Sequence, residues 1–377
     1  MANQLTSEQQ MLQDGVERIV REHGRFEQWR QSSASAEPFD RGVWQQMAEL
    51  GWLGLGLAED LGGIGGSPAD TALVMEGFGR GLLRQPYVSS CILSMRLLAA
   101  SGEPLAIALL EGITSGTTLV TTALAEAHGR FDLHRIRTRA TQSDEGFTLQ
   151  GEKSWVPDAS SADWIIVPVR TSGAEDAPSG ISLFLVPAAA PGLQRQDFRS
   201  PDHQHISQLR LDQVLLPATA LIGPPGGGLD LLEEAVDHAI VARMSEACGA
   251  MDAVAAMTLD YIKTRKQFGA TIGSFQSLQH RMVDMMIACE ESRSILGAAL
   301  QSLAGSPNQR RRAVSAAKTR IGQCGLFVGH QAVQLHGGIG TSDELAVSHY
   351  LKRLLMIDLA YGNSDHHLER FAATAAA

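Results

Sequence analysis

The sequence predicts a mainly helical protein with a central β domain. Apolar residues recur at three- and four-residue spacing through much of residues 5–100 and 229–373, which is the helical period. Short apolar runs with turn signals roughly every ten residues occupy residues 119–221, as strands do. Helices on both sides of a compact run of strands favour separate α and β domains over alternating βαβ units. We therefore expect an N-terminal helical domain, a central β domain and a C-terminal helical bundle, at residues 1–118, 119–222 and 223–377.

The first domain contains four stretches with a helical apolar pattern, at residues 5–23, 42–50, 68–83 and 89–100. Between two of them lies GLAEDLGGIGGS, in which five glycines allow tight turns and close backbone approach. This string is not a dinucleotide-binding fingerprint, because no strand precedes it.

The central domain contains the strand-like runs TLVTTAL, FTLQG, DWIIVPVRT, ISLFLVPA and QLRLDQVLLP, and GPPGGG marks its end. From Leu229 one apolar face continues up to Gly269. A helix of about 35 residues there would span roughly 50 Å and requires a long bundle. Further helices are expected at residues 275–304, 308–335, 347–359 and 364–373.

Composition excludes several classes of protein. The 377 residues include 31 basic and 41 acidic residues, so the net charge of −10 disfavours binding to nucleic acids and anionic membranes. The N-terminus lacks the features of a secretory signal, and no long uncharged apolar run follows, so we expect a cytoplasmic protein. The four cysteines lack metal-ligand spacing, and reduced, buried thiols are expected.

The most informative string is YIKTRKQFGATIGSFQSLQHRMVDM, residues 261–285, where one helix ends and another begins. Arg265 offers a charged fork suited to a pyrophosphate, Phe268 a flat face, and Gln267 and Gln276 amide groups. These groups suit a nucleotide, although an ordinary helical turn with an exposed arginine explains the pattern equally well.

Other strings are less specific. In QLHGGIG, residues 334–340, paired glycines would let the backbone approach a ligand closely. Trp155 in GEKSWV is, on physics alone, favoured as a core indole. His366 and His367 favour a capping or surface role over a metal site, because adjacent helical side chains diverge. The run of three arginines at residues 310–312 favours a solvated face over a contact to a ligand phosphate.

Taken together, these strings resemble the acyl-CoA dehydrogenase family along the whole chain. The resemblance lies in LAEDLGGIGG, GxKxWV, RxQFG followed by FQ, and QxHGGxG. Details such as LDYIKTRKQFG, CGAMDA and YGNSDHHLERF are most similar to the pimeloyl-CoA dehydrogenase small-subunit branch. The resemblance implies an N-terminal α domain, a central β barrel and a C-terminal four-helix bundle.

The resemblance also implies FAD bound between two subunits and an acyl-CoA substrate that is desaturated to the enoyl-CoA. Trp155 corresponds to an indole that packs on the flavin. Most of the other matching positions correspond to residues that hold the nucleotide part of the FAD of the neighbouring chain. The matching positions are Arg265, Gln267, Phe268, Gln276, Gln334, Gly337, Gly338 and Asn363. An electron-transferring flavoprotein is the implied electron acceptor.

The family's catalytic glutamate is absent. Its usual position, 23 residues after Gly338, is occupied by Tyr361, and a tyrosine with an ordinary pKa of about 10 is a poor base at neutral pH. The alternative position on the long helix is Ala239. Two acidic residues are candidates for a relocated base: Glu246, which lies on the long helix, and Asp365, four residues after Tyr361.

The β domain also departs from the family. The motif that lines flavin and substrate in the family reads AEAHGRFD at residues 125–132, so Ala125 and Phe131 replace hydroxyl residues. Pro157 replaces a threonine and lacks a backbone donor.

These departures favour a half-site subunit of an α2β2 heterotetramer, whose homologous partner supplies the glutamate. Two alternatives stay open: a self-sufficient homomeric enzyme with a relocated base, and a purely structural partner that binds no flavin. The acyl chain is equally open, and dicarboxylic, steroid side-chain and branched acyl-CoA thioesters all fit.

Overall fold

The computed structural model of the chain describes residues 5–374. Its contacts divide the chain into two compact units. The helical unit comprises Met1–Ala34, Pro68–Leu83 and Ile240–Ala377, and the mixed unit comprises Ser35–Ser67 and Arg84–Ala239. The predicted fold class, mainly helical with a central β domain, is confirmed. The three-domain division at residues 1–118, 119–222 and 223–377 stays a prediction.

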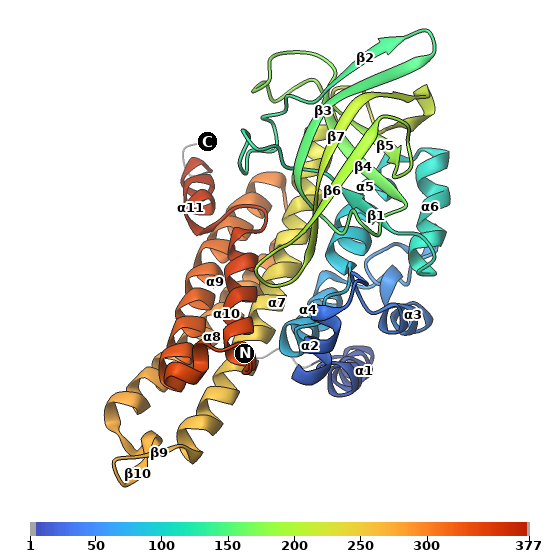
Figure 1. Cartoon of the computed structure of the whole chain (residues 1–377). Coiled ribbons are helices and arrows are strands. Elements are labelled where there is room, and N and C mark those ends of the chain that lie inside the picture. Colours follow the sequence, from blue (N-terminus) through green and yellow to red (C-terminus); the bar gives the residue numbers. More distant parts are fainter. Residues whose placement is uncertain (1–4, 375–377) are drawn as a thin grey trace. The chain divides into compact units, whose positions relative to one another are not determined.

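In the helical unit, α9 contacts α8, α10 and α11, and α1 contacts α4 (Figure 1). Helix α9 begins with a capping box, in which Ser306 and Gln309 satisfy each other's backbone donors and Pro307 takes the first turn. The helices of this unit are α1 (Ser7–His23), α2 (Phe26–Ala34), α4 (Pro68–Gly81), the later part of α7 (Gly228–Thr264), α8 (Gln276–Ser302), α9 (Pro307–His336), α10 (Ala346–Leu359) and α11 (Ser364–Ala373).

The mixed unit contains an eight-stranded sheet whose core includes Leu149, Val167, Phe184 and Leu209. The strand order is β6 (Leu193–Arg199), β7 (His205–Leu216), β3 (Gly146–Pro157), β2 (Arg139–Ser143), β4 (Trp164–Arg170), β5 (Ile181–Pro187) and β8 (Leu221–Ile222), and β1 (Val120–Thr122) pairs with β4. The unit also contains α3 (Arg41–Glu49), the π-helix η3 (Tyr87–Ser94), α5 (Met95–Ser101), α6 (Pro104–Thr114) and the short helices η1 (Trp52–Gly54), η2 (Glu59–Leu61) and η4 (Ala218–Ala220).

The predicted helices are confirmed within a few residues at their ends, with two exceptions. The stretch at residues 89–100 is divided between η3 and α5, and the long helix ends at Thr264 rather than Gly269. Helices α2 and α6 and strands β2 and β6 were not predicted. The thiols are free as expected, but Cys289 is only partly buried.

Candidate functional site

The RKQFG string forms the tip between α7 and α8. Strands β9 (Lys266–Gln267) and β10 (Ala270–Thr271) pair there as a hairpin with a two-residue loop (Figure 1). Phe268 and Gly269 have φ of 52° and 80°, so both central residues are left-handed, as a type I′ turn requires. Phenylalanine is rare at such a position, and its ring is 92% exposed. Strained positions of this kind concentrate at functional sites.

The polar residues predicted to hold a nucleotide surround this tip. Arg265, Gln267 and Gln276 are all exposed, and Gln276 is the first residue of α8. Phe268 meets Phe275 edge to face, with 6.3 Å between ring centroids. An arginine, two amides and two accessible rings thus lie beside a helix N-terminus, where backbone N–H groups favour anions.

The QLHGG string is brought to the same end of the bundle. Tyr261 stacks on His336 with ring centroids 4.3 Å apart, and Tyr261 O accepts from Arg265 N. His336 directly precedes the turn that begins at Gly337, where φ is 66°. Gln334, Gly337 and Gly338 are exposed, and a Cβ added at either glycine would meet no atom within 4 Å.

Trp155 is not a core residue, which corrects the interpretation favoured on physics alone. Its side chain is 51% exposed and its φ is 53°. The pairing of β3 with β7 shifts register between Lys153 and Val156, so a bulge at this point turns the indole away from the core. The sequence has no signal for this bulge.

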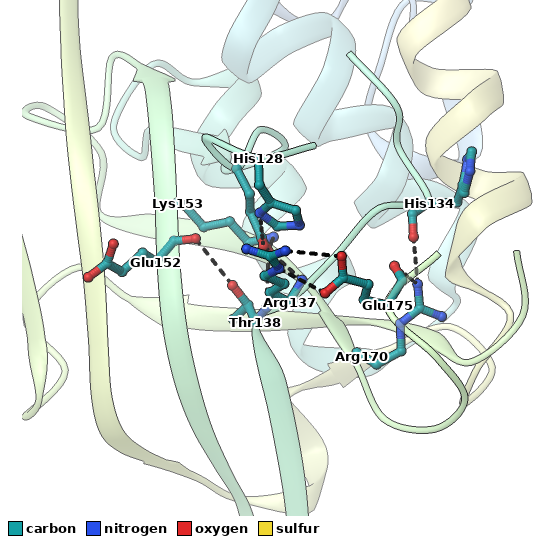
Figure 2. A network of polar contacts seen from close by, with 9 residues as sticks. His128, His134, Arg137, Thr138, Glu152, Lys153, Arg170 and Glu175 are labelled. Atoms are coloured by element: carbon teal, nitrogen blue, oxygen red, sulfur yellow. Dashed lines mark hydrogen bonds and ion pairs between the residues drawn. The ribbon is translucent and has the colours of Figure 1, made fainter. Parts of the chain in front are cut away.

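A buried ion pair, which the sequence analysis missed, anchors β3 just before Trp155. Lys153 Nζ lies 2.7 Å from Glu126 Oε1, and both side chains are buried (Figure 2). The carboxylate also accepts from the backbone N–H groups of Arg137 and Thr138. Burial would raise the pKa of Glu126, but Lys153 and these donors outweigh it and lower the pKa. Glu126 lies between two alanines, but Lys153 follows Glu152 in a polar stretch, so no sequence signal marked the pair.

Sequence models of the acyl-CoA dehydrogenase N-terminal, middle and C-terminal domains match residues 6–116, 121–214 and 226–376. The chain belongs to the acyl-CoA dehydrogenase family. The probable acyl-CoA dehydrogenase YngJ of Bacillus subtilis is 28% identical over 96% of both chains. The acyl-CoA dehydrogenase FadE27 of Mycobacterium tuberculosis is 26% identical over 88% of this chain and 87% of that protein.

Two solved structures are similar in fold over almost the whole chain. A variant of the Tcur3481-Tcur3483 steroid ACAD has a TM-score of 0.88 at 28% identity and covers 98% of both chains. The ChsE4-ChsE5 complex from Mycobacterium tuberculosis has a TM-score of 0.90 at 26% identity, covering 100% of this chain and 99% of that one. The closer resemblance to pimeloyl-CoA dehydrogenase small subunits stays a prediction.

The usual base position of an acyl-CoA dehydrogenase lies in the turn between α10 and α11. Tyr361 has a left-handed φ of 59°, and its carbonyl oxygen lies 3.0 Å from His367 Nε2. Burial, with Lys318 and Arg370 nearby, lowers the pKa of His367 to about 2, so the imidazole is neutral and donates to this carbonyl. Asn363 accepts from His366 N and caps α11, so its side chain has at least this structural role.

The two substitute bases have different environments. Glu246 is 1% exposed, and its carboxylate accepts from Arg353 Nε at 2.6 Å and Arg243 Nη1 at 2.7 Å. Burial would raise the pKa of Glu246, but the two arginines outweigh it and lower the pKa. This arrangement argues against Glu246 as a relocated base. Asp365 is exposed in the first turn of α11, outside any buried environment.

Metal and membrane sites receive no support. Residues 5–374 contain no group of three or more His, Cys, Asp or Glu side chains arranged to hold a metal ion. His367 is 1% exposed, which corrects the expected surface role for this residue. Within the same residues, no helix combines the length and apolar character needed to cross a bilayer.

Proposed function

We propose that this chain is the half-site subunit of a heteromeric, FAD-dependent acyl-CoA dehydrogenase, with an α2β2 assembly. The observation that carries the proposal is a contrast within one chain. The end of the helical unit around Arg265–Gln276 and Gln334–Gly338, which we call the bundle end, displays an exposed arginine, amides, rings and glycines with free space beside them. The two base positions, in contrast, hold Tyr361 and Ala239. A partner of the same family would supply the missing carboxylate.

The bundle end fits the nucleotide half of FAD. Arg265 and the N-terminus of α8 suit a pyrophosphate, because a guanidinium and free backbone N–H groups both favour anions. Phe268 offers an exposed face for an adenine, and Gln267, Gln276 and Gln334 offer amide donors and acceptors. Gly337 and Gly338 leave room for close backbone approach. All of these groups face outward, as a contact to a neighbouring chain's cofactor requires.

The chain's own β domain is less suited to the flavin. Trp155 is exposed and could pack on a ring. However, Ala125 and Phe131 lack the family's hydroxyl groups at their positions, and Pro157 has no N–H to donate. FAD, when bound, supplies the acceptor for the β-hydride of the acyl-CoA, and the α-proton must then pass to a carboxylate of the partner. An electron-transferring flavoprotein would reoxidise the cofactor.

The paired assembly of one similar protein, the ChsE4-ChsE5 complex, favours this interpretation. The test is to purify the chain alone and with the product of the adjacent gene, and to measure FAD per chain and acyl-CoA dehydrogenation. We expect little FAD and no activity for the chain alone, and both for the complex. Stoichiometric FAD and full activity in the isolated chain would refute the division of roles.

The same assay addresses the relocated base. Asp365→Asn should leave the activity of the complex unchanged, because the base belongs to the partner. A large loss of activity with an unchanged FAD content would instead support a self-sufficient enzyme that uses Asp365.

A further inference from the structure

The turn at residues 360–363, between α10 and α11, has a backbone that its surroundings must hold in place. Two left-handed residues follow each other there, Tyr361 with φ of 59° and Gly362 with φ of 111°. This conformation is unfavourable for a tyrosine, and such residues persist only where the neighbouring structure fixes them. The side chains that fix this turn come from α9, α10 and α11, and the proposed function has not used them.

The two ends of the turn are tied to each other. Lys318 Nζ, from α9, donates to Ile357 O and Asp358 O at the end of α10. Asp358 Oδ1 accepts from Ser364 Oγ at 2.6 Å, which joins the end of α10 to the first residue of α11. Gly322 on α9 allows this contact, because a Cβ there would collide with both of these side-chain oxygens.

His367 fixes the middle of the turn. Its Nε2 lies 3.0 Å from Tyr361 O, and its Nδ1 lies 3.3 Å from Ser315 Oγ. Burial lowers the pKa of His367, so the imidazole is neutral and carries one ring proton. Arg370 Nη1 donates to the Ser315 hydroxyl, which is then left to donate its own proton to Nδ1. Nε2 therefore keeps the ring proton and donates it to the Tyr361 carbonyl, so these contacts select one tautomer.

The turn presents a pair of amide donors. Asn363 Oδ1 accepts from His366 N at 3.0 Å and thereby caps α11. The amide NH2 of Asn363 makes no hydrogen bond within the part of the chain that the structure describes. Because the cap fixes the carboxamide oxygen, the two N–H donors also have a set direction. The partly buried side chain thus offers two donors to a ligand at a fixed place.

We propose that His367 is a positioning residue for the bound cofactor: it holds the turn through Tyr361 O, and the turn directs the amide donors of Asn363 at an oxygen acceptor of FAD. This role rests on the proposed function, which brings FAD into contact with this chain. A donor that is ordered before the ligand arrives binds more tightly, because less conformational freedom is lost on binding. The imidazole is 1% exposed, so it acts through the turn and not by contact with the ligand.

A purely structural role for His367 predicts a different outcome. Loss of its hydrogen bond would then lower the stability of the chain and leave the cofactor affinity of the folded complex unchanged. His349 serves for comparison, because it is 4% exposed in the same unit and its Nε2 lies 3.4 Å from Asp343 O. Its ring contacts Phe26 and Trp29 rather than the turn.

The test measures the dissociation constant of FAD for the co-expressed complex, by flavin fluorescence after the bound flavin has been removed. We expect His367→Leu to weaken FAD binding by roughly five- to tenfold, the equivalent of about one neutral hydrogen bond. His367→Gln should bind FAD like the wild type, since its amide N–H replaces the imidazole donor. The control His349→Leu should lower the urea midpoint and leave the FAD affinity unchanged.

Two further measurements separate positioning from a folding defect. Hydrogen exchange at residues 360–364, measured on the chain without FAD, should be faster in His367→Leu than in His367→Gln. Asn363→Asp keeps the capping oxygen but loses the NH2 donors, so it should lose FAD affinity while its urea midpoint is retained. This variant tests the donor even if His367→Leu yields no folded complex.

The inference is overturned if His367→Leu or Asn363→Asp binds FAD as tightly as the wild type. It is equally overturned if His367→Gln or His349→Leu loses as much FAD affinity as His367→Leu, or if hydrogen exchange of the turn is the same in both His367 variants. A wild-type complex that binds no FAD would contradict the proposed function. If the wild-type complex binds FAD and His367→Leu binds it equally well, only the positioning role is wrong.

Discussion

At the scale of single residues, the buried charges of the helical unit serve the fold. The Glu246 carboxylate pairs with Arg243 and Arg353, and replacing it with an amide would remove a buried negative charge from between two arginines. We expect Glu246→Gln to lower the free energy of unfolding by about 3–5 kcal/mol. Urea denaturation measures this, with Glu290→Gln on the exposed face of α8 as the control. Unchanged stability with lost dehydrogenase activity would instead identify Glu246 as a base.

Lys318 makes stability depend on pH. Its Nζ is buried and donates to Ile357 O at 2.5 Å and Asp358 O at 2.8 Å. Burial lowers the pKa of Lys318 to about 7, below the ordinary lysine value of about 10.4. Between these values the unfolded chain binds more protons than the folded one, so this residue makes stability rise with pH from about 7 to about 10.

We expect Lys318→Met to remove that rise. The substitution also leaves two backbone carbonyls without a donor, which should cost about 1–3 kcal/mol at the pH of maximum stability. Urea midpoints of both proteins, measured across this pH range, test the prediction. Parallel curves for the two proteins would show that Lys318 stays charged in the folded state.

The sequence predicted the site residues of the bundle end better than those of the β domain. The strings that contain Arg265 and His336 come together because Tyr261 joins them, and both strings had been selected from the sequence. The exposure of Trp155 could not be predicted, because a bulge in β3 decides it. Glu126 and Lys153 were overlooked because a buried ion pair leaves no periodic pattern.

At the scale of elements, two glycines allow α4 and α7 to pack closely. A Cβ at Gly79 would lie 1.9 Å from Glu246 O, and a Cβ at Gly249 would lie 1.9 Å from Glu76 O. We expect Gly249→Ala to lower the free energy of unfolding by about 1–3 kcal/mol, because the helices must move apart. Gly297→Ala on α8 is the matched control, since its Cβ would meet nothing within 4 Å.

The control should raise the free energy of unfolding by up to about 1 kcal/mol, which is the helix preference of alanine over glycine. Urea denaturation of both variants gives the comparison. If Gly249→Ala were as stable as Gly297→Ala, the close packing of α4 on α7 would not depend on this glycine.

The elements that the sequence did not predict were missed for different physical reasons. Strands β2 and β6 are almost entirely exposed, so neither has the apolar alternation of a half-buried strand. Helix α6 begins with Pro104 at its first turn, which was an available signal for a helix start. The π-helix η3 has all eight residues buried, so its apolar pattern could not reveal its period.

At the scale of the whole molecule, the proposed heteromer requires the bundle end to bind the nucleotide part of FAD. Arg265 is exposed and makes no side-chain hydrogen bond or ion pair with the residues that the structure describes, so its loss should not affect folding. Its position beside the N-terminus of α8 suits contact with a pyrophosphate from outside the chain. The cofactor content of the complex is therefore the property that Arg265 should control.

We expect Arg265→Ala to weaken FAD binding in the co-expressed complex by roughly 10- to 100-fold, which is the value of one charged hydrogen-bonding contact. Lys263→Ala is the matched control, since it removes an exposed positive charge from the last turn of the same helix. FAD content after dialysis and the mass of the complex in solution are measured for both variants. On the proposal that Arg265 contacts the cofactor rather than the partner chain, the FAD content should fall while the mass of the complex stays constant. An Arg265→Ala complex with full FAD content would favour a purely structural partner subunit.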